Sequence, residues 1–459
     1  MSEKIIVSVA DFGAIAGSEE FQEKAIQNAI DHVFLAGGGE VQVPAGVYRV
    51  RGLRVRSNII FHLLENAVLE GSRDPDDYFI LKDDKIEPVD PDQLDDSAWE
   101  RVDGAPKHFH KYASRWHNAV IRIYHAENVS IIGEKGSVID GKNCYDAKGE
   151  EYYRGPHGIS IINSEHIVLR GYTARNTGNW AQAIQNTKNL LVEEVINEAG
   201  HDGVHITTCE DVIIRKCEFY TGDDCVAGYN NKNVLVEDCE INSACSAFRF
   251  SGTNVLVHRC HMFAPPKFMF RGRMSKEEKE AGIMANDSAY YKDNARSMLS
   301  IFTYYAEPAT KIYNLGTNIV IRDCLIENAD RFLHYNYSGN ELWQRGTPML
   351  DIKFENIKAS GIAMPLTAYG DADIPVELTL ENIEFSFSEG KEDTTFIRAA
   401  NYKKIRMKNV NILNAGADHL IKSWDTDKKG EIEFINVKCS IPDEKRVIYT
   451  DEPFFCQAI

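Results

Sequence analysis

The chain has 459 residues, of which 43% are hydrophobic and 26% are charged, as is usual for a soluble globular protein. Asp and Glu number 69 against 51 Lys and Arg, which gives a formal net charge of −18. A surface of this sign repels phosphate, so the composition argues against nucleic acid as a partner. An anionic sugar would also be repelled and would need local arginine or lysine in order to bind.

The opening stretch, residues 1–13, contains an apolar run too short for the core of a secretion signal. No later stretch approaches the roughly 18 consecutive apolar residues that span a bilayer. We therefore expect a cytoplasmic protein with no membrane partner. The 10 cysteines are too sparse for a disulfide framework, which is consistent with that compartment.

Residues 21–36 are predicted to form a helix, because their apolar side chains recur at helical spacing. The run Gly37-Gly38-Gly39 follows directly, and glycine ends helices. We expect this helix to cap the open end of a repeat fold, where strand edges and core would otherwise meet water.

A repeat of about 22 residues runs through the middle of the chain. Each copy opens on a polar residue and continues with apolar residues rich in Val and Ile; the clearest copies open at Asn189, Asp211, Asn233 and Asn254, 22, 22 and 21 residues apart. These runs are too short for helices and predict strands. Coils of two or three strands, stacked about 4.8 Å apart, would give an all-β, single-stranded right-handed parallel β-helix. We expect residues 1–459 to form one such domain.

Four cysteines, here called the repeat cysteines, support this register. Each lies six residues after the polar residue that opens its copy: Cys217, Cys239, Cys260 and Cys324. A shared offset predicts one column along the coil. A metal or redox ladder is the alternative, but small apolar side chains filling a tight interior are the favoured interpretation.

Two stretches interrupt the period, residues 80–118 and residues 265–316. The openings at Asn254 and Asn318 are 64 residues apart, about three coils. A solenoid places insertions outside its coils, and long loops in a compact domain are often functional. We expect both excursions to wall one cleft.

Several short pieces occur in a fixed order: Ala10-Asp-Phe-Gly-Ala, Val43-Pro-Ala-Gly-Val-Tyr, Val138-Ile-Asp-Gly, Arg154-Gly-Pro and Asn176-Thr-Gly-Asn-Trp180. In this order they resemble glycoside hydrolase family 28, the polygalacturonase-like enzymes of the pectin-degrading parallel β-helix superfamily. The resemblance covers roughly residues 8–260. It implies an inverting glycosidase with its catalytic carboxylates in two motifs.

Three aspartates match those motifs. Asp202 lies in Gly-His-Asp-Gly, and Asp223 and Asp224 lie in Thr-Gly-Asp-Asp-Cys, one coil later. Gly-Asp-Asp is also a common turn sequence, so the pair alone is weak evidence of a catalytic site. The position of Asp202 one coil earlier is what favours the catalytic interpretation. Glycoside hydrolysis needs one protonated carboxyl for the leaving oxygen and one ionised carboxyl to activate water or to attack. The resemblance implies that Asp223 is the acid and that Asp202 and Asp224 position the water. We expect mutual repulsion to raise one apparent pKa and a carboxyl spacing of roughly 6.5–9.5 Å, which fits inversion.

The residues that would recognise galacturonate depart from the family pattern. Ala244-Cys-Ser stands where Gly-His-Gly is expected, and Arg-Ile-Lys has no clear copy. The candidate substrate-binding residues are His201 and His205 beside the acids, the cations Arg154, Arg249 and Arg271, and Trp180 as a stacking surface. Surface or packing roles are the alternatives for each. Along a strand, four residues separate two imidazoles by roughly 13 Å, so the histidines predict no metal site.

We therefore predict a glycoside hydrolase, without a cofactor, that is inverting and exo-acting on uronate-containing or related oligosaccharides. A polysaccharide lyase or uronate epimerase on the same fold is one alternative, and a non-catalytic carbohydrate-binding β-helix is another. The fold alone does not choose among them. The sequence does not indicate the sugar, the linkage or the oligomeric state.

Overall fold

The computed structural model describes residues 5–81, 116–148, 154–283, 287–288, 297–306, 312–338, 346–425 and 427–451. These residues divide into two compact units. The first holds the described residues up to Cys225 together with the segment 267–288, and the second holds residues 226–266 and those from 297 onward. The single domain expected over residues 1–459 stays a prediction. No helix of the described ranges is long and apolar enough to cross a membrane.

The predicted capping helix is present as α1 (Glu23–Leu35). Its buried face, with Ile26, Ile30 and Val33, packs against the first strands of the fold. Gly37 follows at φ 98°, a left-handed conformation that glycine adopts without strain and that ends the helix. The other described helical segments are short: η1 (Val9–Phe12), η2 (Pro75–Leu81), η5 (Arg271–Arg273), α4 (Lys276–Glu280) and η7 (Asp443–Lys445).

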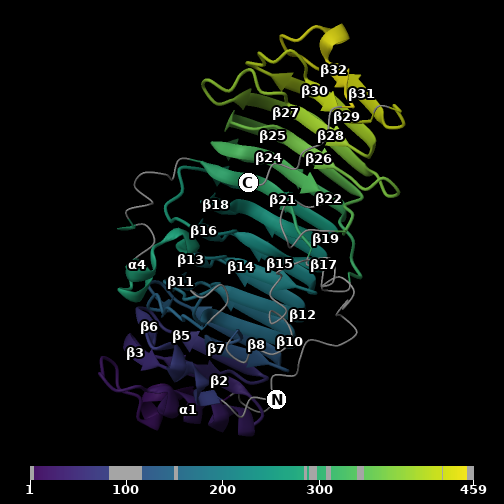
Figure 1. Ribbon diagram of the computed structural model, residues 1–459. Coiled ribbons are helices and arrows are strands. Elements are labelled where there is room, and N and C mark those ends of the chain that lie inside the picture. The colour runs from purple at the N-terminus through teal and green to yellow at the C-terminus, as the bar shows by residue number, and fades with distance from the viewer. Residues whose placement is uncertain are drawn as a thin grey trace. The chain divides into compact units, whose positions relative to one another are not determined.

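The first unit is built from parallel strands that stack coil upon coil in three ladders (Figure 1). The first ladder runs β1 (Ile5–Ser8), β2 (Gly39–Val43), β5 (Ile59–Leu63), β8 (Glu127–Gly133), β10 (His157–Arg170), β12 (Gln182–Glu193) and β15 (Glu210–Arg215). The second runs β3 (Gly46–Val50), β6 (Ala67–Gly71), β9 (Val138–Asp140), β11 (Thr173–Arg175), β13 (Ile196–Ala199) and β16 (Glu218–Thr221). The third runs β4 (Leu53–Arg54), β7 (Ala119–Tyr124), the first halves of β10 and β12, and β14 (Val204–Thr207). Three parallel ladders per coil are the predicted parallel β-helix.

The second unit repeats this plan. Its first ladder runs β17 (Val226–Glu237), β19 (Ser246–His258), β22 (Thr317–Arg322), β25 (Asp351–Ile362), β27 (Val376–Phe387), β29 (Tyr402–Ile412) and β31 (Glu431–Ile435). Its second begins β18 (Glu240–Ser243), β20 (His261–Phe263) and β23 (Leu325–Glu327), and continues into the later parts of β25, β27 and β29. Its third begins in β17 and β19 and runs β21 (Met298–Tyr304), β24 (Ala329–Asn336), β26 (Leu366–Tyr369), β28 (Ile397–Ala400), β30 (Ile421–Ser423) and β32 (Val447–Tyr449).

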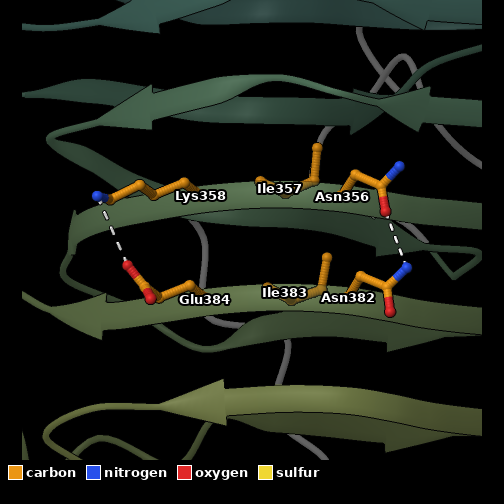
Figure 2. A pocket seen from close by; sticks show the side chains of 6 residues that line it. All are labelled: Asn356, Ile357, Lys358, Asn382, Ile383 and Glu384. Atoms are coloured by element: carbon orange, nitrogen blue, oxygen red, sulfur yellow. Dashed lines mark hydrogen bonds and ion pairs between the residues drawn. The ribbon is translucent and has the colours of Figure 1, made fainter.

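The polar residue that opens each repeat turns the chain between ladders. Asn189, Asp211, Asn233 and Asn254 all have φ between 53° and 58°. Asn and Asp tolerate this left-handed conformation better than other residues with a side chain, which explains why they recur. Equivalent asparagines stack, as Figure 2 shows for Asn382, whose amide donates to Asn356 at 2.8 Å beside the ion pair of Lys358 and Glu384.

All four repeat cysteines are buried, and none of the four forms a disulfide bond. Within the second unit, Cys260 hydrogen-bonds to Cys239 and to Cys324. Three successive coils of that unit therefore stack their cysteines in one interior column, as predicted.

The second predicted excursion is shorter than its bounds of 265–316 imply. β21 lies within it and pairs with β19, and β22 pairs directly with β19 in the next ladder. Because β22 lies next to β19 in the first ladder, the step of 64 residues from Asn254 to Asn318 advances that ladder by one coil. Most of the 80–118 excursion, residues 82–115, lies outside the described residues.

Candidate active site

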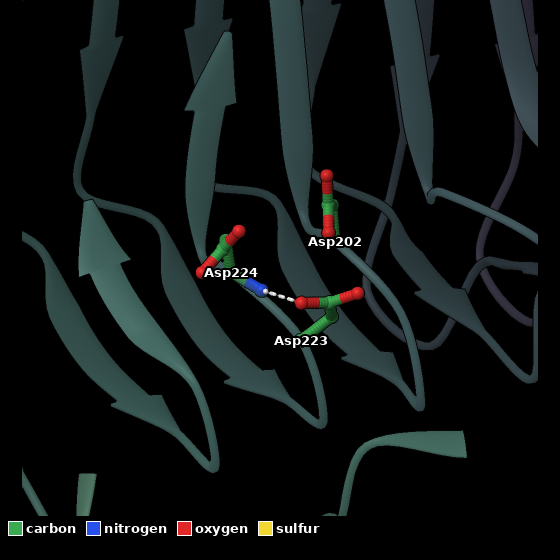
Figure 3. A group of neighbouring side chains, drawn as sticks. All are labelled: Asp202, Asp223 and Asp224. Carbon is green, nitrogen blue, oxygen red and sulfur yellow. Dashed lines mark hydrogen bonds between the residues drawn. The ribbon is translucent and has the colours of Figure 1, made fainter. Parts of the chain in front are cut away.

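Three buried carboxylates come together where the second ladder of the first unit gives way to the third. Asp202 lies two residues before the start of β14, and Asp223 and Asp224 lie two and three residues after the end of β16 (Figure 3). The backbone sets their register, because Gly203 donates its N–H to the carbonyl of Asp224 at 3.0 Å, and Ala181 donates to the carbonyl of Asp202 at 2.9 Å. Residues 21 apart in sequence therefore face each other on neighbouring coils, as predicted.

The carboxylates are close enough to act on one small molecule. One oxygen from each of Asp202, Asp223 and Asp224 lies within 4.8 Å of the others. Asp223 Oδ1 accepts a hydrogen bond from the N–H of Asp224 at 3.1 Å. Such a group has the chemistry to hold a water molecule or a cation between its oxygens. The separation of roughly 6.5–9.5 Å expected for inversion is measured between whole carboxyl groups and not between one chosen oxygen of each, so that expectation stays a prediction.

Each of two aspartates has a basic side chain as a partner. Arg154 Nη2 lies 3.5 Å from Asp223 Oδ2, and His205 Nδ1 lies 2.8 Å from Asp202 Oδ2. Thr221 donates its hydroxyl to the carbonyl of Asp223 at 2.7 Å, which steadies the turn that carries the pair. Arg154 and His205 were predicted beside the acids, whereas the contribution of Thr221 was not.

An aromatic group stands behind these partners. Trp180 stacks on His205 with ring centroids 3.6 Å apart and planes 5° from parallel, and the guanidinium of Arg154 lies 5.9 Å from the Trp180 ring. Trp116 and His157 pack against Trp180 at 4.9 and 5.4 Å. Because His205 covers one face of Trp180, the geometry does not favour the predicted sugar stacking. Trp116 and His157 were not predicted, because neither belongs to a motif and only the stacking of coils brings them here.

Part of the second excursion lies against the acid turns. The N–H of Arg271 donates to the carbonyl of Gly200 at 2.8 Å, and Phe270 meets the ring of His201 edge-on at 6.1 Å. Gly222 needs its missing side chain, because a Cβ there would stand 1.8 Å from the carbonyl oxygen of Met269. The segment 267–283 thus borders the acid turns, as expected of this excursion.

His201 and Arg271 are both buried in this region. Burial, together with the positive charges of Arg154, Arg271 and Lys279, holds the pKa of His201 well below its usual value, so the ring is neutral. Arg271 donates to the carbonyl oxygens of Gly178, Asn143 and Cys144 at 2.8–3.0 Å. This geometry favours a structural part for Arg271, and its predicted part in substrate binding stays a prediction.

Arg249 belongs to the second unit. It lies on β19, where its guanidinium stacks over Tyr305 at 4.3 Å. Its predicted contact with substrate stays a prediction, as does that of His201.

The fold is that of a parallel β-helix, and the site is a cluster of carboxylates of the kind that glycosidases use. Residues 103–246 match the family described as glycosyl hydrolases family 28. A probable polygalacturonase from Vitis vinifera is 25% identical over 232 residues, which are 48% of this chain and 43% of that protein.

A hyperthermoactive exopolygalacturonase from Thermotoga maritima superposes with a TM-score of 0.66 over 89% of this chain and 91% of its own, at 14% identity. A mannuronan C5-epimerase from Azotobacter vinelandii is 43% identical over 65 residues, which are 14% of this chain and 6% of that protein. The predicted resemblance to glycoside hydrolase family 28 is confirmed, and so is the parallel β-helix fold. The chain spans less than half the length of the grapevine relative.

Proposed function

We propose that this chain is a glycoside hydrolase in which Asp223 protonates the leaving oxygen while Asp202 and Asp224 activate water. The observation that carries the proposal is the meeting of three buried carboxylates from adjacent coils, with oxygens within 4.8 Å. The family match over residues 103–246 includes all three.

The partners of the aspartates fit these roles. When Asp223 gives up its proton it becomes a carboxylate, and Arg154 at 3.5 Å stabilises the new negative charge. Asp202 accepts a hydrogen bond from His205, which suits a carboxylate that stays ionised in order to take a proton from water. The two roles are thus divided between carboxyls with different neighbours.

We infer that the substrate is an oligosaccharide that contains uronate or a related sugar, and that cleavage begins at a chain end. The names of the related polygalacturonases and exopolygalacturonase support both parts. Inversion is proposed on the family resemblance. The cytoplasmic location stays a prediction; it would favour short oligosaccharides over polymers.

A second candidate is epimerisation or β-elimination at C5 of a uronate. The 65 residues that are 43% identical to a mannuronan C5-epimerase favour it, although they cover 14% of this chain. Both of these reactions remove the C5 proton and add no water to the product. Their mass balance therefore differs from that of hydrolysis.

The test is a screen of uronate-containing oligosaccharides with the wild-type chain, read by mass spectrometry. Hydrolysis yields two products whose masses sum to substrate plus one water, with single sugars released first. Elimination yields two products whose masses sum to that of the substrate, and the unsaturated one is lighter by one water than the corresponding hydrolysis product. Epimerisation leaves the mass of the substrate unchanged. Binding without any product would support the non-catalytic alternative and overturn the proposal.

A further inference from the structure

The side chain of His205 contacts Asp202 through one ring nitrogen and Trp180 through the face of its ring. His205 Nδ1 is 2.8 Å from Asp202 Oδ2, and both residues are buried. The same imidazole lies flat on Trp180, with 3.6 Å between ring centroids. We propose that His205 is a positioning residue that keeps Asp202 ionised and aimed at the attacking water. This inference rests on the proposed function.

The direction of the hydrogen bond follows from the chemistry of the pair. An ionised carboxylate can only accept hydrogen bonds, so Nδ1 of His205 must carry the proton and donate it. A base that accepts such a bond is held in its ionised form, which is the form that can take a proton from water. The stack on Trp180 fixes the plane of the imidazole and therefore the direction of the Nδ1–H.

The contacts continue from the base to the acid. Trp180 lies beside Arg154, whose guanidinium is 5.9 Å from the ring, and Arg154 pairs with Asp223 at 3.5 Å. The side chains of His205, Trp180 and Arg154 thus link Asp202 to Asp223. They come from neighbouring coils, since His205 lies on β14, Trp180 just precedes β12 and Arg154 precedes β10. The spacing of acid and base depends on this linked set.

The reaction step can be written with His205 outside the proton transfer. A water O–H bond breaks and its proton passes to Asp202, while the water oxygen forms a bond to the anomeric carbon. The glycosidic C–O bond breaks, and the leaving oxygen takes the proton of Asp223. His205 keeps its own proton on Nδ1 throughout. This role uses Nδ1, the atom that is hydrogen-bonded to Asp202, whereas a sugar-binding role would have to use the other ring nitrogen, Nε2.

The test compares two amides of different reach, His205→Asn and His205→Gln. The amide nitrogen of Asn reaches the place of Nδ1, whereas that of Gln reaches the place of Nε2. We expect Gln to lower kcat about 10- to 100-fold, as for loss of a hydrogen bond to a charged group, with KM within about 3-fold of wild type. Asn should restore kcat to within about 5-fold of wild type, because it keeps the donor. His205→Phe keeps a ring for the stack but has no donor, and it should behave as Gln does.

Circular dichroism and urea titration identify which variants fold, and the comparison uses those that do. Equal kcat for Asn and Gln, or a rise in KM at unchanged kcat, would overturn the positioning role. The failure of the proposed function looks different, since a wild-type chain that cleaves no glycoside overturns it directly. Turnover that is abolished by Asp223→Asn and untouched by His205→Gln overturns the inference about His205 alone.

Discussion

The substitution Asp223→Asn isolates the proposed general acid. The amide is nearly isosteric, and its single oxygen can still accept from one of the two donors that Asp223 now has, Arg154 at Oδ2 or the N–H of Asp224 at Oδ1. It cannot give a proton to the leaving oxygen. General acids contribute typically 10²–10⁴ in rate, which is about 2.7–5.5 kcal/mol in the barrier, so we expect a kcat loss of that size.

The stability of the variant follows from the charges around it. Two unit charges 4.8 Å apart interact by about 3–4 kcal/mol at an effective dielectric constant of about 20. Asn at position 223 removes repulsion from two carboxylates and attraction to one guanidinium at 3.5 Å. At that dielectric constant the two repulsions sum to about 7 kcal/mol and the attraction is about 5 kcal/mol. For an ionised Asp223 the free energy of unfolding should therefore rise by up to about 2 kcal/mol, and for the protonated acid, which has no charge to lose, it should stay close to wild type.

The assay measures kcat on an oligosaccharide that the wild type hydrolyses, with urea titration of each variant as the check on folding. Asp211→Asn is the matched control, because Asp211 is exposed at φ 58°, where Asn is well tolerated. The double variant Asp202→Asn with Asp223→Asn should be little worse than the worse single one, since groups that act as one unit are not additive. Near-full activity of Asp223→Asn would refute the assignment of the acid.

Three further predictions concern the surroundings of the site and the core. Burial holds the pKa of both His157 and His201 well below 6.5, so the unfolded chain binds more protons below that pH. Stability should therefore be complete above pH 6.5 and fall as pH drops, by up to about 1.4 kcal/mol per pH unit for each histidine; urea titrations at pH 7 and 5.5 that give equal values would contradict this. Arg271→Met should lower the free energy of unfolding by about 2–3 kcal/mol, because three buried carbonyls lose their donor, whereas the exposed Arg273→Met should not. A hydrogen bond with Cys239 and burial raise the pKa of the Cys260 thiol, so thiol reagents should label the repeat cysteines only after unfolding; rapid labelling of native protein would refute the interior column.

The fold was predictable because the coil repeats a local requirement. Asn189 and Asp211 mark turns in the left-handed conformation, which few other residues adopt, so their spacing reports the length of one coil directly. The long loops carry no such signal. The step from Asn254 to Asn318 is as long as about three coils and was expected to be a loop excursion, but β21 lies within it and pairs with β19, which the break in the period did not reveal.

The part of the site that is formed by residues of the two aspartate motifs was predictable from the sequence. Asp202, Asp223 and Asp224 were expected on adjacent coils, and the register of Gly203 with Asp224 places them there. The partners of a side chain across coils are set by rotamers and by the strands that bend between ladders. The stack of Trp180 on His205 is therefore visible only in three dimensions.

The side chain of Arg271 illustrates the same limit. Its charge and position suggested a ligand for a uronate carboxylate. In the folded chain its guanidinium donates to backbone carbonyls of residues 127, 128 and 93 positions earlier. In the sequence, a buried arginine that hydrogen-bonds a loop to the coils has the same signal as an arginine that binds a substrate.

The most direct test of the central claim is cleavage of a reactive oligosaccharide in ¹⁸O-labelled water, followed by mass spectrometry and by NMR of the freshly formed product. Hydrolysis through Asp223 with water held by Asp202 and Asp224 predicts one ¹⁸O at the new anomeric carbon and an initial anomeric configuration opposite to that of the substrate. A labelled product that retains the configuration would contradict the water-activating role and fit a carboxylate nucleophile. An unsaturated or C5-epimerised product without ¹⁸O would contradict hydrolysis itself.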